Sequence, residues 1–265
     1  MAKARINAVE TAYELRGAGV PLVLIHGAQG DQSMFNSFAP VFARDYRVLT
    51  FDQRGSGLSE KPHGDYSIAQ LADDTAALMD HVGFDAAHIV GVSMGGMIAL
   101  EFALRHPQRV HALVLGCTTP GGPKAVKIGG DAFTAAYSAT PMSSEDRGRA
   151  LAEAAFTKGY LDRHPEIVPA MSEARRQRPL DPVALEGRLK AAIRHDVYDR
   201  LAQIKCPTLV ITGKDDALIS WKNSQLLADH IGNAKLVLLE PAGHCFWLEQ
   251  PEQSHQAIEH FLMQH

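Results

Sequence analysis

The stretch HIVGVSMGGMIAL, residues 88–100, joins a strand-like sequence to a helix-like one through a single serine. Its first half is continuously apolar, which is typical of a strand buried on both faces, and its second half has apolar residues at helical spacing. The join, GVSMG (residues 91–95), matches the pattern G-x-S-x-G, in which the serine occupies a sharp strand-to-helix turn. Glycines lack the Cβ atoms that would collide in such a turn. The pattern predicts that Ser93 presents a nucleophilic hydroxyl; the alternative is a serine that only caps the helix.

Similar apolar runs recur along the chain and alternate with helical patterns. The expected strands are residues 21–27, 46–52, 87–93, 110–117, 206–213 and 234–240, and the expected helices include residues 70–81, 97–104, 226–231 and 257–262. Such alternation predicts an α/β fold with a mostly parallel central sheet flanked by helices. Near the N-terminus, residues 4–9 and 11–15 alternate polar with apolar side chains, which indicates an antiparallel edge hairpin.

The alternation stops between residues 118 and 203. A loop rich in glycine and proline comes first, followed by helical patterns at residues 144–158, 165–176 and 182–195 with no strand between them. Helices inserted between two strands of a sheet indicate a cap. We therefore predict a core domain made of residues 1–120 and 204–265, with a helical cap at residues 121–203.

Composition excludes several classes of function. The 265 residues carry a net charge of −4, so no basic surface for nucleic acid is expected. No apolar run approaches the ~20 residues of a membrane span, and the N-terminal sequence lacks a secretory signal. Cys117, Cys206 and Cys245 are scattered, which argues against a disulfide framework and a structural zinc site. We expect a cytoplasmic monomer or homodimer that uses no cofactor or metal, with a small molecule as its partner.

A serine hydroxyl needs a base that accepts its proton, and His244 is the candidate. It follows the last predicted strand, in the sequence LLEPAGHCFWLEQP (residues 238–251). The imidazole in turn needs an acid, and Asp215 and Asp216 both follow the strand at residues 206–213. The order Ser…Asp…His is the one expected on an α/β sheet, but spacing leaves both aspartates open.

Acyl transfer also needs donors for a tetrahedral oxyanion. One expected donor is the backbone N–H of Met94, directly after the serine. The other is the N–H of Ala28, in the loop IHGAQGDQSMF (residues 25–35) after the first parallel strand. In the same loop, we expect His26 to fix the backbone through a hydrogen bond rather than to transfer protons.

Five motifs together resemble those of α/β-hydrolase-fold enzymes along almost the whole chain. They are HGAQG (residues 26–30), DQRGSGLS (52–59), GVSMGG (91–96), TGKDD (212–216) and AGH (242–244). In that family the acid usually stands three residues beyond the glycine that ends its strand. Counted from Gly213, the resemblance selects Asp216 over Asp215. It gives DQRGSGLS a role in shaping the loop beside the site and no catalytic role.

The resemblance implies a serine hydrolase with the triad Ser93, Asp216 and His244, most similar to the esterase and 3-oxoadipate enol-lactonase group. We expect it to cleave a small carboxylic ester or lactone through an acyl-enzyme intermediate. The alternatives are hydrolysis of a carbon–carbon bond in ring-fission products, cofactor-free perhydrolysis, and a hydrolase-like receptor that binds a ligand.

The cap contains candidates for substrate recognition. Arg175, Arg176 and Arg178 lie close together, and one of them could bind a substrate carboxylate; the alternative is a solvated helix face. Side chains that could line an apolar pocket are Phe133, Tyr137, Met142, Phe156 and Met171, although packing is the more common role of such residues. Phe246 and Trp247 are expected to fix the loop that carries His244.

Overall fold

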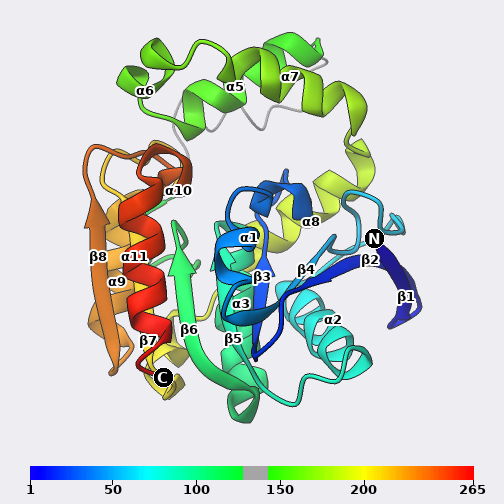
Figure 1. Ribbon diagram of the computed structural model, residues 1–265, viewed down its shortest axis with the longest axis vertical. Helices are drawn as coiled ribbons and strands as arrows, with labels where there is room; N and C mark the ends of the chain where they lie inside the picture. Colours follow the sequence, from blue (N-terminus) through cyan, green and yellow to red (C-terminus); the bar gives the residue numbers. More distant parts are fainter. Residues whose placement is uncertain (128–142) are drawn as a thin grey trace.

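The computed structural model describes residues 1–127 and 143–265. Strands in this part form one sheet in the order β1-β2-β4-β3-β5-β6-β7-β8 (Figure 1). The strands are β1 (Ala2–Ile6), β2 (Val9–Arg16), β3 (Val20–Ile25), β4 (Tyr46–Phe51), β5 (Ala87–Val92), β6 (Val110–Gly116), β7 (Thr208–Gly213) and β8 (Ala234–Leu239). Pairing is parallel from β4 to β8 and antiparallel between β1, β2 and β4. The predicted mostly parallel sheet is confirmed.

The N-terminal hairpin is present, but its turn lies earlier than the sequence pattern indicates. Residues 4–9 were expected to form one strand, whereas β1 ends at Ile6 and β2 starts at Val9. Asn7 and Ala8 form the turn with φ of +44° and +67°. These positive φ angles suit a two-residue hairpin turn, and neither residue is the glycine that usually marks one.

Helices cover both faces of the sheet, which explains why the parallel strands are apolar throughout. Val23 and Ile25 of β3 pack on one face with α2, α3 and α9, whereas Leu22 and Leu24 pack on the other with α1 and α11. The helices of the core are α1 (Ala39–Phe42), α2 (Ile68–His81), α3 (Met94–Arg105), α9 (Trp221–His230), α10 (Phe246–Glu249) and α11 (Pro251–Leu262). Short 3₁₀ helices occur at η1 (Gln32–Phe35), η2 (Pro107–Arg109) and η3 (Tyr198–Gln203).

In the described residues between β6 and β7, four further α-helices occur, and we call them the inserted helices. They are α5 (Ser144–Ala155), α6 (Lys158–Arg163), α7 (Ile167–Gln177) and α8 (Pro182–Arg194). Figure 1 shows α5, α6 and α7 across the carboxyl end of the sheet, with α8 leading back toward it. The helix expected at residues 144–158 is interrupted at Thr157, whose side chain accepts a hydrogen bond from the Tyr160 N–H and so caps α6. The domain boundaries at residues 121 and 203 stay a prediction.

Register places the ends of the central strands side by side. Ile25 of β3 pairs with Gly91 of β5, Gly91 pairs with Leu115 of β6, and Gly116 pairs with Ile211 of β7. Residues that follow these strands therefore meet at one edge of the sheet, beneath the inserted helices. No helix in the described ranges has both the length and the apolar character that a bilayer span requires.

Candidate active site

Ser93 occupies the sharp turn between β5 and α3. Its φ is +56° and its ψ is −124°, a backbone conformation that a non-glycine residue rarely adopts. A Cβ atom at Gly91 would lie 2.2 Å from the Gly95 carbonyl oxygen, and one at Gly95 would lie 2.0 Å from the carbonyl oxygen of Ile25. Both glycines are therefore required. The Ser93 side chain makes no capping hydrogen bond to α3, so the alternative of a capping serine is wrong.

His244 and Asp216 form a buried hydrogen-bonded pair. His244 Nδ1 lies 2.8 Å from Asp216 Oδ2. The other carboxylate oxygen, Oδ1, accepts hydrogen bonds from the N–H groups of Leu218 at 2.8 Å and Ile219 at 2.9 Å. Asp215 is exposed, and only its backbone N–H is held, by the carbonyl of Ala242. Of the two aspartates that the spacing left open, the structure therefore pairs Asp216 with the histidine.

The Asp216 carboxylate decides the charge preference of His244. Burial lowers the pKa of this imidazole, but the adjacent Asp216 carboxylate and, after it, Cys117 together outweigh burial and raise the pKa well above 6.5. An acceptor at Nδ1 also fixes the proton on that nitrogen, which leaves Nε2 as the nitrogen able to accept a proton. The pair thus has the geometry of a general base with its orienting acid.

The loop after β3, residues 26–30, lies against Ser93, and we call it the oxyanion loop. A Cβ atom at Gly27 would be 3.2 Å from Ser93 Cβ and 3.5 Å from Ser93 Oγ. Ala28, the residue expected to donate its N–H, is buried and lines the same cavity as Ser93. Met94, the other expected donor, is the first residue of α3, where backbone N–H groups have no partner within the helix.

His26 is buried and bonded to backbone on both sides of its ring. Nδ1 donates to the Gly27 carbonyl oxygen at 2.8 Å, and Nε2 accepts from the Gln53 N–H at 3.3 Å. Burial, followed by the positive charge of Arg188, lowers the pKa of His26 to about 3. The predicted backbone hydrogen bond of His26 is confirmed.

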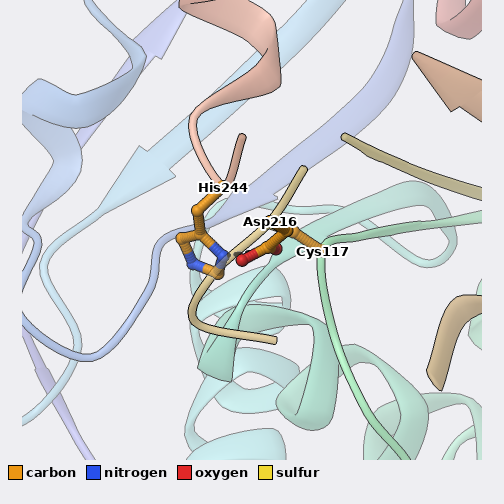
Figure 2. A group of neighbouring side chains, drawn as sticks. All are labelled: Cys117, Asp216 and His244. Carbon is orange, nitrogen blue, oxygen red and sulfur yellow. Dashed lines mark hydrogen bonds and ion pairs between the residues drawn. The ribbon is translucent and has the colours of Figure 1, made fainter. Parts of the chain in front are cut away.

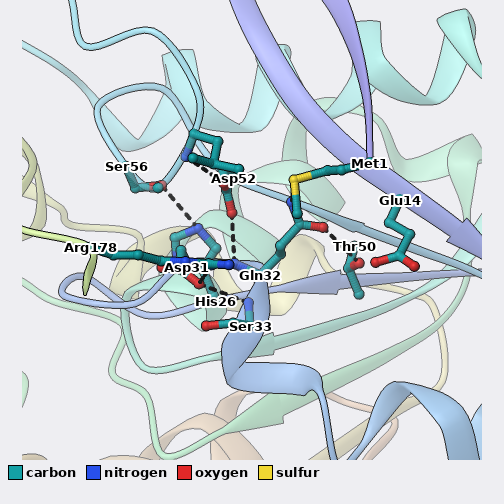
Figure 3. Close-up of polar contacts among 12 residues, drawn as sticks. Met1, Glu14, His26, Asp31, Gln32, Ser33, Thr50, Asp52, Ser56 and Arg178 are labelled. Atoms are coloured by element: carbon teal, nitrogen blue, oxygen red, sulfur yellow. Dashed lines mark hydrogen bonds and ion pairs between the residues drawn. The ribbon is translucent and has the colours of Figure 1, made fainter. Parts of the chain in front are cut away.

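The DQRGSGLS segment is hydrogen-bonded to the residues that follow the oxyanion loop. Asp52 accepts a hydrogen bond from the N–H of Gln32 at 2.8 Å (Figure 3). It also accepts one from the N–H of Leu58, in its own loop, at 2.7 Å. Burial raises the pKa of this carboxyl, and the two N–H groups act in the opposite direction. Asp52 therefore connects its own loop to the segment that follows β3, in agreement with the shaping role expected for the motif.

A cavity of about 660 Å³ lies between the core and the inserted helices. Ser93 and His244 both line it, together with Phe156 and Met171, two of the side chains expected at an apolar pocket. Phe133, Tyr137 and Met142 lie outside the described residues. Phe246 and Trp247 are buried in the core beneath the His244 loop, and Trp247 also reaches the cavity.

Comparison with known proteins agrees with this fold. The profile of the α/β hydrolase fold matches residues 20–251. The chain belongs to the α/β-hydrolase family. It is 32% identical over 232 residues, 86% of this chain and 82% of the other, to 3-oxoadipate enol-lactonase 2 of Acinetobacter baylyi.

Two further proteins extend the comparison. A putative carbamate hydrolase of Stutzerimonas stutzeri is 30% identical, covering 93% of this chain and 94% of the relative. The crystal structure of the enol-lactonase from Burkholderia xenovorans superposes with a TM-score of 0.86 at 27% identity, covering 99% of this chain and all of that one. These similarities establish a hydrolase of the α/β fold and agree with the expected enol-lactonase and esterase group.

Among the described residues, the cavity of this hydrolase is lined by more cations than anions. Arg175 donates to the Gln29 carbonyl oxygen at 2.9 Å, and Arg178 pairs with Asp31 at 3.1 Å (Figure 3). Both line the cavity, whereas Arg176 points to solvent and pairs with Glu173 on its own helix. Arg147 also lines the cavity. Sequence reasoning did not single out Arg147, because nothing in its helical pattern distinguishes it from exposed arginines.

Cys117, the residue after β6, is a further neighbour of the buried pair in this hydrolase. The Cys117 Sγ, a carboxylate oxygen of Asp216 and a ring nitrogen of His244 all lie within 4.8 Å of one another (Figure 2). Thiol, carboxylate and imidazole groups can all bind zinc. In this structure, however, His244 and Asp216 are hydrogen-bonded to each other at 2.8 Å.

Cys245 is a second cysteine near the site, and it lines the cavity. Burial raises the pKa of its thiol to about 12, which makes it a poor nucleophile.

Proposed function

We propose that this protein is a serine hydrolase that cleaves a small carboxylic ester or lactone through an acyl-enzyme intermediate. The observation that carries the proposal is the position of Ser93. Its strained turn places it at a cavity that it shares with His244, and His244 is hydrogen-bonded to Asp216. Nucleophile, base and orienting acid are the three parts that acyl transfer by a hydroxyl requires.

In the proposed reaction, Ser93 Oγ attacks the carbonyl carbon of the ester while His244 Nε2 accepts the hydroxyl proton. Asp216 stabilises the imidazolium that forms. The oxyanion accepts hydrogen bonds from the N–H groups of Ala28 and Met94. His244 then gives its proton to the leaving alkoxide as the carbon–oxygen bond breaks. A water molecule then attacks the acyl carbonyl while His244 accepts its proton. His244 returns the proton to Ser93 Oγ as the bond between the acyl group and the serine breaks.

The cavity supports a small acidic substrate. Its volume of about 660 Å³ lies in the range of small-molecule sites, which extends from roughly 300 to 1,000 Å³. Its charged lining residues in the described part of the chain are Arg147, Arg175 and Arg178 against Asp31, which favours an anion. The name of one relative, 3-oxoadipate enol-lactonase 2, indicates that the relative acts on a lactone. We therefore propose a lactone or ester that also carries a carboxylate.

The test is hydrolysis of p-nitrophenyl acetate and of a small enol-lactone by wild type and Ser93→Ala. We expect kcat/KM to fall by about 10⁴-fold or more in Ser93→Ala, because the nucleophile is lost. Ser37→Ala is the matched control, since Ser37 lines the same cavity at an exposed position away from the turn. Turnover by Ser93→Ala within tenfold of wild type would contradict the proposal.

The same assay separates the alternatives. Turnover of ring-fission dienoates with poor esterase activity would indicate carbon–carbon hydrolysis. Oxidation that depends on added peroxide would indicate perhydrolysis, and one product per protein molecule followed by arrest would indicate a receptor.

A further inference from the structure

Arg188 lies in the middle of α8 and is fully buried, although it belongs to the inserted helices. Its side chain is 0% exposed and is the largest fully buried one in the described part of the chain. The other buried residues of α8 are Ala184, Gly187 and Ala191, so Arg188 is on the helix face turned toward the core. An arginine is almost never placed there unless its guanidinium makes specific contacts.

The contacts of Arg188 lead to the oxyanion loop. Nη2 lies 3.0 Å from Gln53 Oε1 and 3.3 Å from the Gly27 carbonyl oxygen, and it donates to both. The amide of Gln53 donates in turn to the His26 carbonyl oxygen at 2.6 Å. Arg188 therefore contacts the loop directly and through one intermediate side chain.

Three donors converge on the carbonyl of Gly27. Besides Arg188, the Gly30 N–H donates at 3.2 Å and His26 Nδ1 donates at 2.8 Å. This carbonyl belongs to the same peptide group as the N–H of Ala28. The group is planar and trans, so its carbonyl and its N–H point in opposite directions. Donors that fix the direction of the Gly27 oxygen therefore fix the direction of the Ala28 N–H as well.

Arg188 differs from the other two donors in its charge. A guanidinium remains protonated in proteins, whereas the backbone N–H of Gly30 and the neutral His26 ring bring no net charge. A cation at the carbonyl end of a peptide polarises the group and strengthens its N–H as a donor, and the effect is larger in a buried site. The neighbouring Gly27 Cα lies against Ser93, as the distance of 3.2 Å from a Cβ at Gly27 to Ser93 Cβ shows.

We propose that Arg188 is a positioning residue that orients and polarises the Gly27–Ala28 peptide as an oxyanion donor. Through this contact an inserted helix becomes part of the catalytic apparatus without touching the substrate. The proposal rests on the function proposed above, since it concerns the oxyanion of that reaction. It adds a residue that neither the sequence motifs nor the triad geometry assigns.

The test compares wild type with Arg188→Met, which keeps the side-chain volume and removes the charge and the donors. We expect kcat to fall by about 30- to 100-fold, somewhat less than the loss of a whole oxyanion donor, with KM changed less than threefold. The affinity of an alkyl boronic acid, measured by binding, should fall by the same factor, because its tetrahedral adduct with Ser93 places an oxygen at the oxyanion position.

A purely structural role predicts a different result. Arg188→Met removes the donor of Gln53 Oε1, and a buried acceptor that loses its donor destabilises the fold, so some fall in melting temperature is expected. A purely structural role would lower kcat only through that loss of folded protein, so kcat is compared at a temperature where both proteins are folded. Arg194→Met, on the same helix at an exposed ion pair with Asp65, is the matched control and should leave kcat and boronate affinity unchanged. A kcat loss that only follows the fraction of unfolded protein would overturn the proposal, as would a kcat within threefold of wild type.

Arg188→Lys keeps the test decisive if the methionine variant does not fold. It retains the charge with a smaller set of donors, so we expect a loss of about tenfold in kcat and in boronate affinity. Wild-type values for both would overturn the proposal. Failure of the proposed function is recognised separately, because it shows as activity in Ser93→Ala, whereas failure of this inference shows as normal kcat in the Arg188 variants.

Discussion

His26 and His244 are both buried at the same edge of the sheet, yet their surroundings have opposite effects on them. The pKa of His26 falls to about 3, whereas that of His244 rises well above 6.5. Burial lowers the pKa in both cases. The difference lies in the neighbours: a backbone carbonyl at Nδ1 with the Arg188 cation nearby for His26, and the Asp216 carboxylate at Nδ1 together with Cys117 for His244. Two buried histidines thus differ in their surroundings: His26 fixes backbone, and His244 is the base of the proposed reaction.

Removing the Asp216 charge should make His244 resemble His26. In Asp216→Asn, burial remains and the carboxylate is lost, so the pKa of His244 should fall and kcat should drop by about 10⁴-fold. In wild type, kcat/KM should rise with pH through the raised pKa of His244, because only the unprotonated ring accepts a proton. The measurement is kcat/KM of a p-nitrophenyl ester from pH 5 to 9.

Asp215→Asn is the control for this prediction, since Asp215 is exposed and adjacent in sequence. Its activity should stay within twofold of wild type. If Asp216→Asn keeps more than a tenth of the wild-type kcat, the difference between the two histidines does not depend on the carboxylate.

The second prediction concerns stability toward acid. The pKa values of His26 and His195 are lowered to about 3 and that of His88 to about 4, in each case mainly by burial. Between pH 6.5 and these values the unfolded chain binds more protons, so the free energy of unfolding falls as the pH decreases through that window. His244 acts in the opposite sense: its contribution is present below pH 6.5 and is lost as the pH rises through its folded pKa.

Urea unfolding at pH 7.5, 6.5, 5.5 and 4.5 checks this prediction. His195→Leu removes one group that must be protonated on unfolding, so its loss of stability from pH 7.5 to 4.5 should be smaller than that of wild type by about 2 kcal/mol. A wild-type unfolding free energy that does not change over this range would show that burial does not keep these histidines neutral.

The smallest expected effect concerns Arg175, which faces the cavity and also contacts the Gln29 carbonyl, whereas Arg188 is fully buried and does not line the cavity. Arg175→Gln should raise KM about tenfold for the p-nitrophenyl monoester of glutaric acid and leave KM for p-nitrophenyl butyrate unchanged, because only the first carries a carboxylate. Arg176→Gln is the matched control, since Arg176 points away from the cavity. An equal change of KM for both esters would indicate that Arg175 acts on cavity shape instead of substrate charge.

Local pattern was sufficient for the parts of the fold and site that depend on neighbours in sequence. The strand β5, the glycines around Ser93 and the strand ends before Asp216 and His244 are each visible in a few consecutive residues, because strand burial and a tight turn constrain adjacent positions. The hairpin turn at Asn7 and Ala8 was misplaced, since Asn7 favours a turn but no glycine follows it and the polar–apolar alternation continues through both residues. Thr157 divides a helical pattern that sequence periodicity treats as continuous.

The α/β sheet, the Ser93 turn and the chain order of Ser93, Asp216 and His244 follow from local sequence pattern. Which arginines meet the site depends on how the chain packs, because helical spacing shows which residues share a face but not what that face contacts. Arg188 falls in register with Ala184, Gly187 and Ala191, at spacings of three and four residues. That spacing was present in the sequence, but its meaning depends on the oxyanion loop, which is about 160 residues away in the chain and in contact only after folding.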